Sequence, residues 1–231
     1  MVRKILLAIG ILVVVTSCSK DLPRQSERQG VTRSATEEDV RRAVLFLGTS
    51  LTAGMGVGAE RAYPALIQEK IDSLGWPFRT VNAGESGGTS AGGVRRIGWL
   101  LRQPVAVLIL ELGANDGLRG QDIPTLRANL QAIIDLTLEA YPDAQIVIAG
   151  MEAPPNLGPD YTSDFRSVFG AVARDNGVHL IPFILDGVAG VPELNQADGI
   201  HPTAEGQRVM ADVVWKVLEP VLRSIDSLEG F

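Results

Sequence analysis

The feature that most constrains the fold is a series of five apolar runs separated by segments with helical spacing. The runs cover 43–48, 78–84, 105–113, 145–150 and 178–185, and the helical segments cover 63–75, 94–102, 123–141, 163–177 and 201–222. Strands that alternate with helices predict βαβ units and one parallel sheet. The runs are mostly continuous rather than alternating with polar residues, which predicts that helices cover both sheet faces.

Length and composition narrow the functional classes. A chain of 231 residues suits one α/β domain with a sizeable core. The formal charge of −6 argues against a nucleic-acid binder, which needs a basic surface to neutralise phosphates. One cysteine and two histidines argue against a zinc or other Cys/His metal centre, so no metal is expected.

The first forty residues differ from the rest of the chain. Arg3 and Lys4 precede an apolar run, 5–15, that ends in small polar residues, as in an export signal. This run is too short to span a bilayer, which takes about 20 residues. Residues 19–40 are polar and predict a flexible tether. We therefore expect a signal peptide over 1–17, a tether over 18–40 and one folded domain over 41–231.

Polar and glycine-rich loops follow the strands, and ligands of parallel sheets bind beyond the carboxyl ends of the strands. Ser50 lies in such a loop, 48–54, where its hydroxyl would be exposed, although serine is also a common turn residue. The loop 82–93 is rich in glycine, which lets backbone donors approach a ligand closely. Asn115 can offer its amide to an anionic oxygen, while its neighbour Asp116 also suits an Asx turn.

Two histidines compete for a chemical role. His201 follows Asp198 by three residues, just before a helix, so the carboxylate and the imidazole can share a hydrogen bond. His179 stands between Val178 and Leu180 inside the fifth apolar run and is expected to be structural.

Taken together, the strings GTSLTAG, NAGESG, ELGANDGLRG and DGIHP resemble, in order, the four sequence blocks of SGNH hydrolases, also called GDSL esterases and lipases. The length and the third string look most like the thioesterase I, lysophospholipase L1 and arylesterase branch. The resemblance implies a three-layer α/β/α, flavodoxin-like sandwich with a five-stranded parallel sheet. It assigns the nucleophile to Ser50, the acid and base to Asp198 and His201, and the oxyanion donors to Ser50, Gly84 and Asn115.

One residue departs from this family pattern. The family usually has an aspartate before the nucleophile, and this chain has Thr49. That aspartate is not one of the three catalytic residues, so the departure bears on how the nucleophile loop is braced. The implied reaction is acyl transfer to water, which requires no cofactor.

The end of the export signal, Val15-Thr16-Ser17-Cys18, resembles a bacterial lipobox. This resemblance implies cleavage before Cys18 and attachment of lipid to its thiol, hence a membrane partner. Ser19, which is not aspartate, fits sorting to the outer membrane, facing the periplasm, in a cell with two membranes. The alternative is an ordinary secretory signal with an incidental cysteine.

These observations lead to a functional hypothesis. We expect a serine esterase of the cell envelope that hydrolyses carboxylic esters or thioesters, such as short to medium acyl esters, aryl esters or lysophospholipids. Met55, Pro154, Pro155 and the segment 183–192 are candidates for an acyl groove, or they simply pack the loops. The alternatives are a carbohydrate O-deacetylase, which the 5% aromatic content disfavours, and a non-catalytic envelope lipoprotein.

Overall fold

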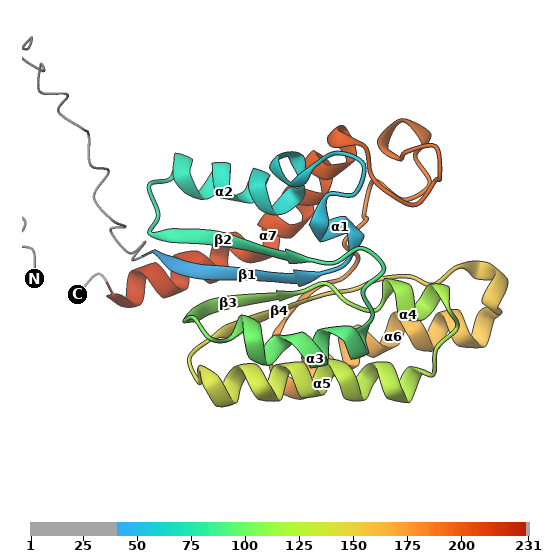
Figure 1. Ribbon diagram of the computed structural model, residues 1–231, viewed down its shortest axis with the longest axis horizontal. Coiled ribbons are helices and arrows are strands. Elements are labelled where there is room, and N and C mark those ends of the chain that lie inside the picture. Colours follow the sequence, from blue (N-terminus) through green and yellow to red (C-terminus); the bar gives the residue numbers. More distant parts are fainter. Residues whose placement is uncertain (1–40, 230–231) are drawn as a thin grey trace, which may run out of the picture. The chain divides into compact units, whose positions relative to one another are not determined.

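The structure is a computed structural model that describes residues 41–229 (Figure 1). The described residues belong to one compact unit. The predicted signal peptide, the predicted tether and Cys18 lie outside the described residues. Among residues 41–229, none of the helices combines the length and the apolar sequence that a membrane span requires.

Five parallel strands form one sheet in the order β2-β1-β3-β4-β5. Their bounds are β1 Arg42–Gly48, β2 Phe78–Gly84, β3 Val105–Leu110, β4 Gln145–Ala149 and β5 His179–Ile181. This is the strand order of flavodoxin-like sheets. The predicted α/β class and the five-stranded parallel sheet are confirmed.

Helices cover both faces of the sheet (Figure 1). One layer contains α2 (Tyr63–Ser73) and α7 (Ala204–Glu229), and the opposite layer contains α3 (Ser90–Leu100), α5 (Ile123–Ala140) and α6 (Pro159–Asn176). Short helices occupy the loops: α1 Ser50–Ala53, α4 Ala114–Leu118, η1 Ala59–Arg61, η2 Pro155–Leu157 and η3 Pro192–Leu194.

The burial of the central strands explains their continuous apolar sequences. In β1 the neighbours Phe46 and Leu47 point to opposite faces, and both are fully buried. In β3 the same holds for Leu108 and Ile109. Because both faces are buried, these strands need apolar residues at every position rather than at alternate ones. The same burial holds the strands in place, and with them the loops at their carboxyl ends.

The fifth strand differs from its prediction. The apolar run covers 178–185, but β5 is only three residues long, because Pro182 has no N–H to continue the ladder. His179 is the first residue of this edge strand, and it is exposed. The expectation that His179 is packed among apolar neighbours was therefore wrong.

Candidate active site

The nucleophile candidate stands at the start of a single helical turn beyond β1. Thr49 has an extended backbone, and Ser50 is the first residue of α1. The N–H groups at a helix start point away from the helix and have no partner within it. Among the described residues no hydrogen bond occupies the Ser50 N–H. The loop thus presents a hydroxyl and a free donor at the same place.

The acid and base candidates, Asp198 and His201, lie beside Ser50 in the structure although His201 is 151 residues away in the sequence. His201 Nε2 lies 2.9 Å from Ser50 Oγ, and His201 Nδ1 lies 2.7 Å from Asp198 Oδ2. The imidazole therefore stands between a hydroxyl and a carboxylate, with one ring nitrogen toward each. This arrangement allows a proton to move from Ser50 to His201 while Asp198 holds the ring.

Asp198 is held in its charged form by local donors. The backbone N–H of His201, the His201 ring and the backbone N–H of Ile200 lower the pKa of Asp198 well below its ordinary value. An ionised Asp198 can only accept hydrogen bonds, which fixes the proton of His201 on Nδ1 and leaves Nε2 free to take the serine proton.

Asn115 lies in α4, directly beyond β3, and lines the same cavity as Ser50 and His201. Its Nδ2 donates to Gly88 O at 2.9 Å, which uses one of its two amide protons. The second proton remains for a bound group. Gly87 also lines the cavity, and within the described residues no hydrogen bond occupies its N–H.

Gly84, the residue predicted as an oxyanion donor, does not lie at the cavity. It is the last residue of β2, and its N–H donates to Asn82 Oδ1 at 2.9 Å. A Cβ at Gly84 would collide with the backbone of α1 at Ala53, so glycine is needed there for close packing. The predicted assignment to Gly84 is therefore corrected: Gly87, three residues further along the same loop, is the glycine that lines the cavity, and its N–H is the candidate donor.

A buried carboxylate holds the two donor loops together. Asp116 accepts from the backbone N–H of Ser90 at 2.9 Å and from its hydroxyl at 2.5 Å, and Asn129 donates to that hydroxyl. Asp116 follows Asn115 directly, whereas Ser90 begins α3 just after Gly87. This network fixes the separation of the two donors, so Asp116 does more than close a local turn.

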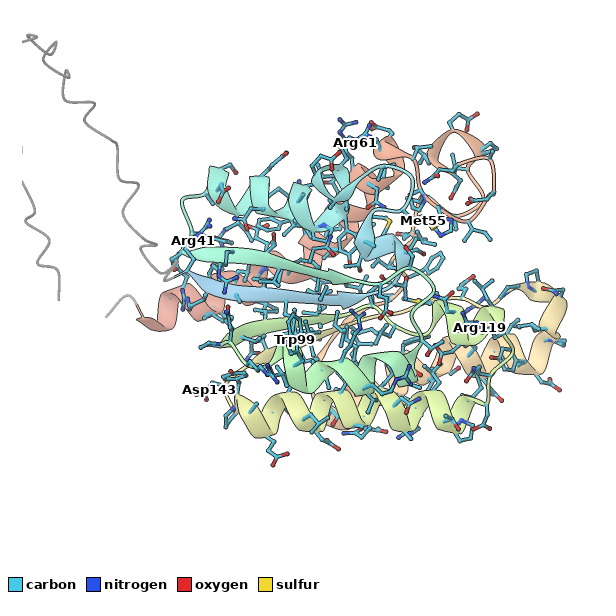
Figure 2. All side chains as sticks on the ribbon, viewed as in Figure 1. Arg41, Met55, Arg61, Trp99, Arg119 and Asp143 are labelled. Atoms are coloured by element: carbon cyan, nitrogen blue, oxygen red, sulfur yellow. The ribbon has the colours of Figure 1, made fainter. Side chains whose placement is uncertain are left out.

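A mostly apolar cavity of about 690 Å³ adjoins Ser50. The predicted groove residues Met55, Pro154 and Pro155 line it, as do residues of the predicted segment 183–192. Sequence reasoning missed Leu118 and Ile200, which also line the cavity and are each 48% exposed. Their exposure has no signal in the sequence, because isolated apolar residues in loops are common. Figure 2 shows Met55 and Arg119 on either side of the carboxyl edge of the sheet.

Comparison with known proteins identifies the family of this chain. Residues 46–209 match the model of the GDSL-like lipase/acylhydrolase family. The chain belongs to this family. Membership makes it an ester hydrolase and confirms the resemblance seen in the four sequence blocks.

Relatives of this GDSL-family chain match it over most of its length. Esterase TesA of Pseudomonas aeruginosa is 38% identical over 188 residues, which are 81% of this chain and 92% of the relative. Thioesterase 1/protease 1/lysophospholipase L1 of Escherichia coli K12 is 37% identical over 183 residues, 78% and 84% of the two chains. A crystal structure of TesA superposes with a TM-score of 0.74 and 39% identity, covering 78% of this chain and 99% of that one.

The amino-terminal region gives a separate match. Residues 3–19, which include Cys18, match the prokaryotic membrane lipoprotein lipid attachment site. The GDSL-family domain therefore belongs to a membrane-anchored envelope protein.

A second buried carboxylate in this GDSL-family enzyme was missed by sequence reasoning. Glu111 is fully buried one residue beyond β3, and its carboxylate accepts from the backbone N–H and the hydroxyl of Thr49 and of Thr52. Tyr63 shares a 2.7 Å hydrogen bond with the Thr52 hydroxyl. Burial raises the pKa of Glu111 above its ordinary value, against the lowering by these donors.

The hydrogen bonds to Glu111 give Thr49 a role in holding the nucleophile loop. Thr49 stands where the family usually has an aspartate, and its hydroxyl donates to Glu111 Oε1 at 2.9 Å. A second carboxylate at that distance would force the pair to share a proton. With threonine, Glu111 accepts from donors that flank Ser50 on both sides and so fixes the turn that presents the nucleophile.

Replacing Glu111 by glutamine is expected to lower kcat by about 10²-fold with little change in KM, because a small misplacement of a reacting group has this effect. Glutamine keeps one acceptor oxygen and replaces the other by an NH₂, which cannot accept from the N–H and hydroxyl donors of Thr49 and Thr52, so at least one buried hydrogen bond to the carboxylate is lost. Steady-state kinetics on a soluble ester measure the change. Thr49→Ser keeps the hydroxyl and is the control; an equal loss in both variants would contradict this role of Glu111.

Proposed function

We propose that this protein is a serine esterase that hydrolyses carboxylic esters and thioesters through an acyl-enzyme on Ser50. The observation that carries the proposal is the 2.9 Å separation of His201 Nε2 from Ser50 Oγ, with Asp198 on the other ring nitrogen. Serine is a poor nucleophile without such a base.

In the first half of the reaction, Ser50 Oγ attacks the acyl carbon as its proton passes to His201 Nε2. The new C–O bond forms, and the carbonyl electron pair moves to the oxygen. That oxyanion is held by the N–H groups of Ser50 and Gly87 and by the Asn115 amide, which belong to residues that line the cavity. Asp198 stabilises the imidazolium.

In the second half, the tetrahedral intermediate collapses and the bond to the leaving group breaks. His201 returns its proton to the departing alcohol or thiol, which leaves the acyl group on Ser50. A water molecule then gives a proton to His201 and attacks the acyl carbon. The second collapse releases the acid and restores the Ser50 hydroxyl, so atoms and charge balance without a cofactor.

The cavity supports short to medium acyl chains or aryl groups as the bound part of the substrate. Its lining is mostly apolar, and Met55, Leu118 and Ile200 extend it to the surface. A lysophospholipid also offers such a chain. A sugar substrate usually stacks on aromatic rings, and Phe183 is the single aromatic residue among the described residues that line the cavity. The lining therefore favours an acyl ester over a carbohydrate O-acetate.

A substrate panel tests this function. Nitrophenyl esters from acetate to palmitate, a thioester, a lysophospholipid and acetylated xylan are assayed with the parent and with Ser50→Ala. We expect the best kcat/KM on a short or medium acyl ester and no release above background with the variant. Activity on acetylated xylan alone would support the deacetylase alternative, and no activity at all would support a non-catalytic lipoprotein.

We also propose that lipid on Cys18 anchors the enzyme to the outer membrane, facing the periplasm, in a cell with two membranes. Cys18→Ala should move the protein from the membrane fraction to a soluble or uncleaved form, because the thiol is the attachment point. Membrane fractionation and labelling with a fatty-acid probe measure this. Unchanged fractionation of Cys18→Ala, or an unlabelled parent, would contradict the anchor; activity of the variant on a soluble ester should be retained.

A further inference from the structure

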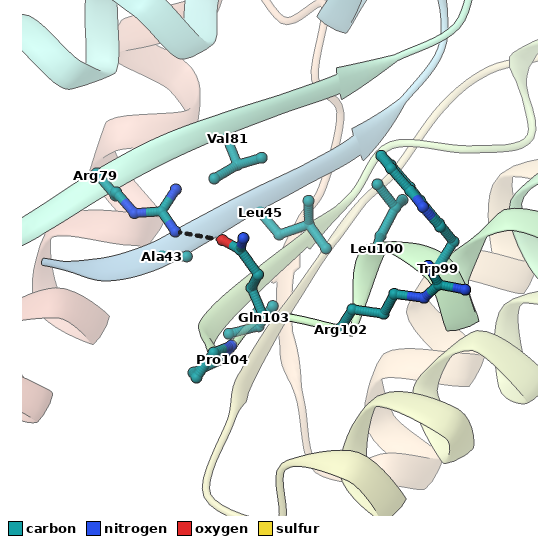
Figure 3. Close-up of a pocket in the computed structure, with 10 residues that line it drawn as sticks. Ala43, Leu45, Arg79, Val81, Trp99, Leu100, Arg102, Gln103 and Pro104 are labelled. Carbon is teal, nitrogen blue, oxygen red and sulfur yellow. Dashed lines mark hydrogen bonds between the residues drawn. The ribbon is translucent and has the colours of Figure 1, made fainter. Parts of the chain in front are cut away.

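A second cavity, of about 310 Å³, lies at the opposite end of the strands from Ser50 (Figure 3). Ala43 of β1 is in register with Arg79 of β2 and with Val105 of β3, and all three line this cavity near the amino ends of their strands. The cavity lining in β1 ends at Leu45, three residues before the strand ends at Gly48, so about 10 Å of strand separates the cavity from the catalytic edge. The cavity has no role in the proposed chemistry.

The cavity exists because one sheet face is left uncovered near its edge. Figure 3 shows Leu45 and Val81 between Arg79 on one side and Trp99 on the other. β2 is one of the two edge strands, and Val81 in it is only partly buried. Trp99, on α3, is 63% exposed, the highest exposure among the large apolar residues of the described chain.

The charge of the cavity is opposite to that of the chain. The chain carries a formal charge of −6, yet the described residues that line the cavity include Arg79 and Arg102 and no acidic residue. Arg79 donates to Gln103, while its Nε is buried and has no hydrogen-bond partner among the described residues. Arg95 is exposed one helical turn before Trp99. Guanidinium groups bind phosphate, and indole rings favour the interface between lipid headgroups and acyl chains. Together they suit a phospholipid.

The anchor supplies a reason for a lipid to be the occupant. The attachment site at Cys18 and the start of β1 at Arg42 restrict the domain to within about 80 Å of the membrane, even for a fully extended connection. The chain enters the domain at the amino edge of β1, where Ala43 lines the cavity. The cavity with its arginines and tryptophan therefore lies at the same edge of the sheet as the point where the chain from the anchor enters the domain.

We propose that the surface formed by Arg79, Trp99 and Arg102 docks on anionic phospholipid of the membrane to which the protein is anchored. The guanidinium groups bind headgroup phosphate, and the Trp99 indole enters the interface. The catalytic cavity, at the other end of the strands, then opens away from that membrane. This last consequence rests on the proposed function and predicts that the enzyme takes its esters from the aqueous phase.

The test is vesicle flotation of a shortened chain that begins at Arg41 and lacks the anchor. A solved chain of TesA matches this domain over 99% of its length, which supports folding of the domain alone. We expect flotation with vesicles of phosphatidylcholine mixed with phosphatidylglycerol, and none with phosphatidylcholine alone. Added salt should weaken binding, since exposed charges are screened.

Substitutions locate the surface. Arg79→Gln with Arg102→Gln should weaken binding by about 25-fold, at roughly fivefold for each arginine, and Trp99→Ala should weaken it further. Arg61→Gln is the matched control, because Arg61 is also exposed but belongs to η1, on the other face of the sheet (Figure 2). All variants should hydrolyse a soluble ester at the parental rate, which shows that they are folded.

Three results would overturn the proposal. The first is equal binding to the two kinds of vesicle, and the second is equal binding by the parent and the double arginine variant. The third is self-association of the parent, seen by sedimentation and lost in Trp99→Ala, in place of vesicle binding, which would assign the surface to a second copy of the chain. None of these results depends on esterase activity, so failure here is distinct from failure of the proposed function.

Discussion

Ser50→Ala, His201→Ala and the double variant are expected to retain nearly the same residual esterase activity, lower than the parent by on the order of 10⁴- to 10⁶-fold. The two side chains act as one unit, since Ser50 Oγ can lose its proton only to His201 Nε2, 2.9 Å away. Removing either partner abolishes the same step, so removing both adds little. Single-turnover release of nitrophenol on one ester measures all three rates.

His179 is the matched control for His201, because the chain has only these two histidines. It is exposed at the start of β5, so His179→Gln should leave kcat within a few-fold and the free energy of unfolding within about 0.5 kcal/mol of the parent. A fully active His201→Ala, or an inactive but folded His179→Gln, would overturn the assignment of the base.

The pH dependence of the same reaction has a definite sign. The donors around Asp198 depress the pKa of this carboxyl, so Asp198 stays ionised on mild acidification. Loss of kcat/KM toward acid pH should therefore not come from Asp198; it is expected because a cationic imidazole cannot accept the serine proton. A parent whose kcat/KM rises on acidification would contradict this mechanism.

Asn115→Ala is expected to lower kcat by about 10²- to 10³-fold with little change in KM, the usual effect of removing one oxyanion donor. The substrate carbonyl gains its negative charge only in the transition state, so ground-state binding should change little. Steady-state kinetics with a nitrophenyl ester separate the two parameters. A rise in KM alone would make Asn115 a binding or structural residue.

The Asn115 side chain also donates to Gly88 O, so its loss loosens the loop that carries Gly87. Arg119→Ala is the matched control, because Arg119 Nη2 donates to Gly87 O at 3.2 Å and holds the same loop without facing the oxyanion. We expect Arg119→Ala to lower kcat by only a few-fold. An equal loss in both variants would assign the effect of Asn115→Ala to the loop.

The sequence alone was sufficient for the features that depend on local patterning. Apolar runs of strand length, separated by helical spacing, indicated the parallel sheet, since burial on both faces requires continuous apolar residues. The order of the strand-end loops then pointed to Ser50, Asn115, Asp198 and His201 as candidates. All four line or adjoin one cavity, because the carboxyl ends of parallel strands meet at one edge.

Tertiary packing decided the features that depend on contacts between distant segments. Gly84 and Gly87 are equally plausible donors in a glycine-rich loop, and only the approach of α1 at Ala53 shows that Gly84 serves packing. In the sequence, Glu111 appears only as a residue at the end of an apolar strand. Its role depends on contacts with Thr49 and Thr52, some 60 residues earlier. The exposure of His179 and of Trp99 likewise depends on which strand lies at a sheet edge and how far a helix covers it. The sequence pattern determines which face of a helix or strand is buried. The space around a side chain and its contact partners are determined only when separate elements pack together.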